Sequence, residues 1–354
     1  MKILDRYIGY NVLVSTLIVI LVLMALFTFF TYMDELGRIG RGNYGALQAA
    51  VYVLFTLPRT LYQLFPMAAL LGSIIGLGIL AGNNELTVIR AAGVSLTRIV
   101  WSVLKVGILL IILSIIIGEW AAPISERYAQ IFRSVALSKN ITLKSKSGLW
   151  ARDGLDYINV KELLPKGRLG DVNIYGFDHQ NRLTNMTHAK EAFYKENHWI
   201  LQNVVNEIIS TESVETRTQT QIIWDTSLSP ELLSVVIVKP DTLSVVGLYQ
   251  YIHYLRDNGL NSDQYELAFW SKLISPLVTG VMVFLSIPFV FGPLRSVGIG
   301  TRILVGALLG TGFYLFNQVF SYVALVYNFN PIFGAGFPTL LFLALAIFLM
   351  RRVQ

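Results

Sequence analysis

Four arginines border the long apolar stretches of the chain at positions suited to binding a phosphate group. Arg38 and Arg41 come shortly after the first apolar stretch, Arg59 stands at the start of the second, and Arg133 follows the third. A guanidinium group binds phosphate oxygens through paired hydrogen bonds. These residues are therefore candidates for contact with the phosphates of an anionic lipid, although arginines at a membrane boundary also serve as ordinary interfacial anchors.

A short segment between the second and third apolar stretches, NNELTVIRAAGVSLTR, has the pattern of a helix of two to three turns. An asparagine at position 83 or 84 can cap its start, and Gly93 is a natural stop. At about 100° per residue, Glu85, Leu86 and Ile89 share one face. We predict that Glu85, Leu86, Ile89 and Arg90 dock into a groove on a cytoplasmic motor. A helix that lies on the membrane surface is the alternative.

Aromatic side chains are abundant in the first and fifth apolar stretches. Such residues are ordinary on helices that face lipid, but they would also suit a cavity for acyl chains. We assign that cavity, or the gate that leads to it, to Phe27, Phe30, Phe313, Phe316 and Phe320.

Several kinds of chemistry lack the residues that they need. The chain has no cysteine, no G-x-x-x-x-G-K-[ST] loop, no H-E-x-x-H and no G-x-S-x-G. Without the glycine-rich loop it cannot cradle ATP in the usual way. We therefore expect no catalytic residue, no metal site and no cofactor in this chain.

A membrane-embedded enzyme that modifies an envelope lipid is the alternative function. It would need a polar catalytic cluster near the outer membrane boundary, where Asp34, Glu35 and Glu119 are the acidic candidates. A passive scaffold for envelope assembly is a third hypothesis, and it predicts that contact with a motor is dispensable.

Membrane helices must position these side chains, because 54% of the 354 residues are hydrophobic and only 14% are charged. About 20 apolar residues cross a bilayer. Six spans, three before and three after a central segment, are predicted from residues 7–33, 60–84, about 99–122, 273–294 and 303–350, the last holding two helices joined by VYNFNPIFG.

The charge is distributed unevenly. Residues 123–272 hold 16 basic and 17 acidic residues, so the flanking blocks carry the net positive charge, and a nucleic-acid partner is not expected. Short loops on the cytoplasmic side of a membrane are enriched in Lys and Arg. With both termini in the cytoplasm, eight basic residues lie on the inside and three in the short outside loops, so we predict this orientation. The eight are Lys2, Arg6, Arg90, Arg98, Arg295, Arg302, Arg351 and Arg352, and the three are Arg38, Arg41 and Arg59.

The central segment has the pattern of a β domain. Stretches such as DYINVKEL, DVNIYGFD and TQIIWDT alternate with turn residues at spacings typical of sandwiches and jelly rolls. We predict an N-terminal transmembrane block over 1–125 with the short docking helix at about 84–93. An extracytoplasmic all-β jelly-roll domain with helical ends follows over 126–264, and a C-terminal transmembrane block completes the chain over 265–354.

Six motifs in order resemble one known family. LDRYIG, FPMAALLG, NNELTVIRAAGVS, GEWAAP, GLWARDG and FGPLRS, spread over residues 4–296, together look like the lipopolysaccharide export permeases LptF/LptG. The first and last of these motifs are most similar to the LptG branch. The resemblance covers essentially the whole chain.

The resemblance implies a non-catalytic permease subunit of an ABC transporter in the bacterial inner membrane. Such subunits pair with an LptF-type paralogous permease and an LptB-type ATPase dimer. They extract lipopolysaccharide from the outer leaflet of the inner membrane through gates in spans one and five. Their periplasmic jelly roll delivers the lipid to LptC-type and LptA-type bridge proteins.

Residue by residue, the resemblance implies that Glu85 contacts the ATPase and that Arg38, Arg59 and Arg133 contact lipopolysaccharide phosphates. The chain also departs from the family pattern. Thr31 and Gly37 stand where some members carry basic residues, and Arg41 adds a charge. The resemblance therefore implies a rearranged set of phosphate contacts.

Overall fold

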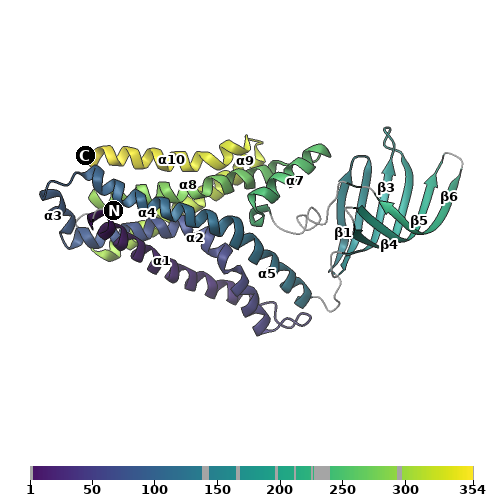
Figure 1. Cartoon of the computed structure of the whole chain (residues 1–354), viewed down its shortest axis with the longest axis horizontal. Helices are drawn as coiled ribbons and strands as arrows, with labels where there is room; N and C mark the ends of the chain where they lie inside the picture. The colour runs from purple at the N-terminus through teal and green to yellow at the C-terminus, as the bar shows by residue number, and fades with distance from the viewer. Residues whose placement is uncertain are drawn as a thin grey trace.

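The chain forms a bundle of long helices with a β sheet at one end of its long axis (Figure 1). The computed structural model describes residues 3–137, 143–164, 168–195, 198–210, 213–224, 226, 240–292 and 297–353. Lys2 and Arg295, which enter the predicted orientation, lie outside these residues. We call the end of the bundle nearer to the sheet the sheet end. The chain termini and α3 lie at the opposite end.

Six helical stretches are long and apolar enough to cross a membrane, which confirms the predicted number. Their helices are α1 (Ile3–Leu36), α2 (Ala46–Gly82), α4 (Leu96–Ile116) with its continuation, α8 (Asp263–Phe291), α9 (Ile299–Val326) and α10 (Pro331–Val353). The predicted turn between the last two spans occupies residues 327–330. The chain is thus a multi-pass membrane protein.

The helices are longer than the charge-free stretches that predicted them. α2 begins at Ala46, and α4 passes through a π-helical turn, Ile117–Ala121, into α5 (Ala122–Leu137). At 1.5 Å per residue, the 42-residue stretch from α4 to α5 is about 60 Å long, about twice the hydrocarbon thickness of a bilayer. These helices therefore extend beyond the membrane at the sheet end and carry charged residues there.

Glycines let the helices around α2 approach closely. A Cβ atom on Gly72 would lie 2.3 Å from the Cα of Thr16 in α1, and one on Gly310 would lie 2.7 Å from Met67 in α2. Side chains at either position would force the helices apart. The small-residue motifs of α2 and α9 thus serve packing within this chain.

Arg302 lies inside the bundle and not in a loop, in contrast to its place in the predicted orientation. It is buried in the first turn of α9, and its Nη1 donates to the carbonyl of Gly78 in α2. Because Gly78 has no side chain, the guanidinium can approach this backbone. Arg302 therefore joins two helices.

The predicted β domain is a six-stranded antiparallel sheet with strands in chain order. The strands are β1 (Leu143–Asp153), β2 (Asp156–Leu164), β3 (Arg168–Phe177), β4 (Leu183–Lys195), β5 (His198–Ile209) and β6 (Val214–Trp224). The described strands form a meander of consecutive neighbours, where a jelly roll has crossing connections. One buried row crosses four strands through Val160, Val172, Ala189 and Val204, as expected when alternate residues face one side.

Helix α7 (Val245–Asp257) connects the sheet with the bundle. Its Tyr251, Tyr254 and Leu255 belong to the core of the sheet. Burial raises the pKa of the Tyr254 hydroxyl, which donates to the carbonyl of Arg152 at 2.6 Å. On the bundle side, both carboxylate oxygens of Glu119 accept from the backbone N–H of Val245 at 3.0 Å.

Candidate phosphate-binding site

Three of the four predicted arginines meet at the sheet end, where α1, α2 and α5 come together. Arg133 Nη2 lies 3.0 Å and Arg38 Nη1 3.5 Å from the same oxygen, Oε1 of Glu35 in α1. Arg59 Nη1 in α2 lies 3.0 Å from Oε1 of Glu126 in α5. Two carboxylates therefore hold three guanidinium groups in one place.

Polar side chains complete this arrangement. Tyr44, in the turn between α1 and α2, donates its hydroxyl to Oε2 of Glu35 at 2.8 Å. Tyr52 of α2 accepts from Arg133 Nη1 at 3.0 Å and lies beneath its guanidinium, 4.7 Å from ring centroid to Cζ. Gln130 donates to Glu126 at 2.7 Å. We call these residues the arginine cluster: Glu35, Arg38, Tyr44, Tyr52, Arg59, Glu126, Gln130 and Arg133.

The carboxylates of the arginine cluster are more deeply buried than its arginines. The side chains of Glu35 and Glu126 are 4% and 1% exposed, whereas those of Arg133, Arg59 and Arg38 are 15%, 25% and 37% exposed. Burial and the neighbouring Glu35 carboxylate raise the pKa of the Tyr44 hydroxyl, so it stays a hydrogen-bond donor. An incoming ligand meets the positive groups before it meets the negative ones.

Hydrogen-bonding capacity remains inside the arginine cluster. Nε of Arg133 and Oε2 of Glu126 are buried without a hydrogen-bond partner. Buried polar atoms are almost always satisfied in folded proteins. With three guanidinium groups and two carboxylates, the cluster carries a formal charge of +1 and can accept an anionic group.

Arg41 lies apart from the arginine cluster. It is exposed in the turn between α1 and α2, and its backbone carbonyl accepts from Tyr44 N at 3.1 Å. The turn is attached to the end of α5, because Asn43 N donates to the carbonyl of Ala136 at 2.9 Å. Gly42 has a φ of +61° and would meet the Leu137 carbonyl with any side chain. Arg41 is thus presented at the surface beside the cluster.

The opposite end of the bundle carries the predicted short helix, α3 (Glu85–Ala91). Asn84 precedes it with a φ of 58°, and Gly93 follows it with a φ of 86°. The Glu85 carboxylate accepts from the Tyr7 hydroxyl of α1 at 2.7 Å. This hydrogen bond attaches α3 to the first turns of α1.

The four predicted docking residues do not share one exposed face of α3. Leu86 is buried in the core of the bundle, and Ile89 packs against that core. Arg90 is exposed, and so is Val88, at 66%. The apolar face that predicted docking is used within the chain, because a seven-residue helix is stable only when packed. Val88 and Arg90 belong to the exposed side of the helix.

The predicted gate phenylalanines lie in two groups. Phe27 and Phe30 are exposed on the sheet-end half of α1. Phe313 is buried with its ring centroid 4.9 Å from Phe342 of α10, and Phe320 stacks 4.7 Å from Phe337 of the same helix. Phe316 also faces Phe337, at 6.5 Å. In the described residues, α10 and not α1 is the aromatic partner of α9.

Comparisons with known proteins agree with this architecture. A family model described as "Lipopolysaccharide export system permease LptF/LptG" matches residues 6–352. The chain belongs to this family. "Lipopolysaccharide export system permease protein LptG" of Haemophilus influenzae is 37% identical over 351 residues, which cover 99% of this chain and 98% of the relative. The protein of the same name in Escherichia coli K12 is 36% identical over 353 residues, with the same coverage.

The acidic residues proposed for an enzyme have other roles in this LptF/LptG family member. Glu119 binds the start of α7, and Glu35 is bound by Arg133, Arg38 and Tyr44. Asp34 is exposed. These contacts position helices and arginines, so they do not favour the enzyme alternative.

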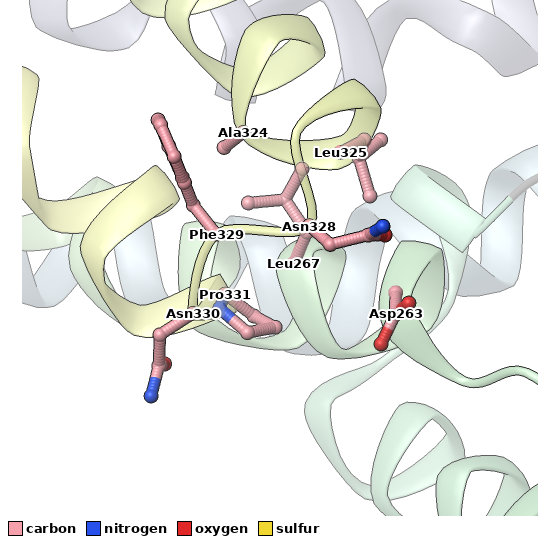
Figure 2. A pocket seen from close by; sticks show the side chains of 8 residues that line it. All are labelled: Asp263, Leu267, Ala324, Leu325, Asn328, Phe329, Asn330 and Pro331. Atoms are coloured by element: carbon pink, nitrogen blue, oxygen red, sulfur yellow. The ribbon is translucent and has the colours of Figure 1, made fainter.

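A small cavity of about 190 Å³ lies at the turn between α9 and α10. Figure 2 shows Asp263 and Asn328 on one side of it and Phe329 on the other. Asp263 is its single carboxylate and accepts from Asn261 at 3.0 Å. Among the described residues, no group of three His, Asp or Glu side chains could hold a metal ion. The cavity lacks the paired groups that acid–base chemistry needs.

Sequence reasoning missed most of the residues that hold the arginines. Glu35 was considered only as a possible catalytic acid, and Tyr44, Tyr52, Glu126 and Gln130 were not singled out. One signal was present in α5, because positions 126, 130 and 133 share a helix face. An acid, an amide and an arginine on one face indicate a polar contact with another helix.

Proposed function

We propose that this chain is the permease subunit of a transporter that extracts lipopolysaccharide from the outer leaflet of the inner membrane. Lipopolysaccharide is a phosphorylated lipid, and its phosphates would bind Arg38, Arg59 and Arg133. The observation that carries the proposal is the arginine cluster at one end of six apolar helices in a full-length family member. The proposal places both termini in the cytoplasm and the sheet in the periplasm.

The energy would come from a partner. ATP and Mg²⁺ would be bound by a separate LptB-type ATPase dimer, which would touch the exposed side of α3 at Val88 and Arg90. An LptF-type permease would complete the lipid path. LptC-type and LptA-type bridge proteins would receive the lipid from the sheet.

The apolar path would be made between two subunits. The exposed Phe27 and Phe30 of α1 are suited to acyl chains or to the facing helix of a paralogous permease. Phe313, Phe316 and Phe320 lie against α10 and would form the other wall, opposite the first span of the partner.

Site-specific photo-crosslinking tests the substrate and the path. A photoreactive amino acid at Phe30 or Arg38, in membranes with and without ATP, should form lipopolysaccharide adducts whose yield changes with ATP. Ile108 of α4 is a matched exposed control on another helix and should give a low yield that does not depend on ATP. Equal yields at all three positions would contradict the proposal.

Copurification tests the motor contact. Val88→Glu places a charge on the exposed side of α3 and should remove most of the ATPase from the purified complex. Thr97→Glu, at an exposed site just beyond α3, is the control and should retain the ATPase. Glu85→Lys also breaks the hydrogen bond to Tyr7, so its effect combines docking and attachment of α3. Full ATPase recovery with Val88→Glu would favour a passive scaffold.

A further inference from the structure

The guanidinium groups of Arg133 and Arg38 already bind an anion in this structure. Oε1 of Glu35 lies 3.0 Å from Arg133 Nη2 and 3.5 Å from Arg38 Nη1. The Tyr44 hydroxyl binds the other carboxylate oxygen at 2.8 Å. Each carboxylate oxygen of Glu35 therefore has a partner in this chain: Oε1 in ion pairs and Oε2 in a hydrogen bond.

A carboxylate and a phosphate monoester compete for the same donors. Both are anions with oxygens spaced to accept from the two nitrogens of a guanidinium group. A phosphate that binds Arg133 and Arg38 with good geometry must use positions that Glu35 now occupies. Its binding free energy is therefore reduced by the cost of displacing this carboxylate.

The position of Glu35 permits such an exchange. It lies in the last turn of α1, one residue before the end of that helix at Leu36, and next to the turn that presents Arg41. Arg38 is 37% exposed, so a phosphate can reach it first. Glu126 is different, because it lies in the second turn of α5, far from the end of that helix at Leu137, with a side chain that is 1% exposed.

We propose that Glu35 is an internal competitor for the phosphate-binding arginines. In the empty protein its carboxylate holds Arg133 and Arg38 in place. When a phosphate monoester arrives, the carboxylate gives up Oε1, and it returns when the phosphate leaves. Glu35 thereby limits the affinity for phosphate and favours release. The inference rests on the proposed function, in which lipid phosphates bind these arginines.

The exchange has a consequence for α1. The Glu35 carboxylate connects α1 to α5 through Arg133 and to the following turn through Tyr44. Displacing it from Arg133 removes the ion pair between these two helices while the Tyr44 hydrogen bond remains. Binding of phosphate would therefore loosen the sheet end of α1 from α5.

Equilibrium binding by the full-length chain in lipid nanodiscs tests the inference. The probes are lipopolysaccharide, the same lipopolysaccharide after enzymatic dephosphorylation, and inorganic phosphate. Glu35→Gln keeps the size of the side chain and one oxygen acceptor, but removes the negative charge. Asp34→Asn removes a charge from the exposed neighbouring residue and is the matched control.

For Glu35→Gln we expect the Kd for phosphorylated lipopolysaccharide to fall about tenfold, because the ion pairs with Arg133 and Arg38 no longer have to be broken. The Kd for the dephosphorylated lipid should not change, and Asp34→Asn should change neither value by more than about twofold. A lower Kd for inorganic phosphate as well would show that the site recognises the phosphate group alone. A lower Kd for the lipid only would show that the acyl chains are needed to bring the phosphate to the site.

A second variant covers the case in which Glu35→Gln does not fold, which its thermal unfolding curve would reveal. Glu35→Asp keeps the charge but shortens the side chain, so the carboxylate competes less well for Arg133 and Arg38 and the Kd should fall about threefold. An unchanged or higher Kd in a folded Glu35→Asp variant would contradict the inference.

Two failures can be distinguished. If the unmodified chain binds phosphorylated and dephosphorylated lipid equally, the proposed function fails at this site and the inference fails with it. If the unmodified chain prefers the phosphorylated lipid but a folded Glu35→Gln variant binds it equally or more weakly, the proposed function stands. Glu35 is then only a structural partner of Arg133.

Discussion

The two ends of α1 each carry a buried carboxylate, but the two carboxylates are held differently. At the sheet end, Glu35 is shared by two arginines and a tyrosine. At the opposite end, Asp5 accepts from Lys105 Nζ at 2.5 Å and from Ser102 Oγ at 2.8 Å, both in α4. One end is a network over three segments, and the other is a contact between two helices.

The two ends also differ in how exposed the basic partner of the carboxylate is. Lys105 is 47% exposed, whereas Arg133 is 15% exposed. A half-exposed lysine can turn to water when its partner is lost, but a buried guanidinium cannot. The opposite end therefore resembles an anchor of α1. The sheet end has surplus positive groups in a confined place, which is what an anion-binding site requires.

The largest expected effect comes from separating α1 from α2, which disturbs both ends at once. Gly72→Val would place side-chain atoms against the backbone of α1, where even a Cβ lies 2.3 Å from Thr16 Cα. We expect a loss of at least about 3 kcal/mol in the free energy of unfolding. Thermal unfolding in detergent measures it. Gly312→Val in α9 is the control, because its Cβ would meet no atom within 4 Å. Equal melting temperatures for the two variants would contradict the close packing of α1 and α2.

The next largest effects are the losses of unfolding free energy when each ion pair is removed. Arg133→Met leaves Glu35 buried without its nearest guanidinium, and we expect a cost of about 3 kcal/mol. Lys105→Met removes a half-exposed partner of Asp5, which keeps its Ser102 hydrogen bond, and should cost about 1 kcal/mol. Denaturant unfolding of both variants in the same detergent checks the ratio. If Lys105→Met proved as costly as Arg133→Met, the opposite end would be as tightly constrained as the sheet end.

The smallest effect concerns the attachment of α3. Tyr7→Phe removes the hydrogen bond to Glu85 at 2.7 Å and should favour local opening of α3. Hydrogen exchange over residues 85–91 should become several-fold faster while exchange in the sheet stays the same. Tyr10→Phe, at an exposed tyrosine one turn further along α1, should leave exchange in α3 unchanged. Unchanged exchange in the Tyr7 variant would mean that packing of Leu86 alone holds α3.

Much of the fold followed from local patterns. Uninterrupted apolar stretches predicted the six spans, and Gly93 marked the end of α3, because each signal depends on residues close together in the chain. The helices extend beyond the predicted spans. α2 contains Arg59 and α5 contains Glu126, and the two charges neutralise each other across 67 positions, so neither ends its helix.

The candidate site was predicted in part. Arg38, Arg59 and Arg133 were selected because of their chemistry and their place beside apolar stretches, and they do meet. Arg41 was selected for the same reasons but stays at the surface. The docking face of α3 stays a prediction, because the apolar pattern of a short helix does not say whether the partner is another protein or the rest of the same chain. Leu86 packs within the chain.

The sequence by itself determined that this protein is a membrane protein with a β domain between two groups of three spans, because hydrophobicity and strand patterns act over a few neighbouring residues. Only the tertiary structure decided which charge meets which. Glu35 and Arg133 are 98 positions apart, and nothing local indicates that they lie within 3.0 Å. Their pairing depends on how α1, α2 and α5 pack, and this packing brings three arginines from separate parts of the chain together.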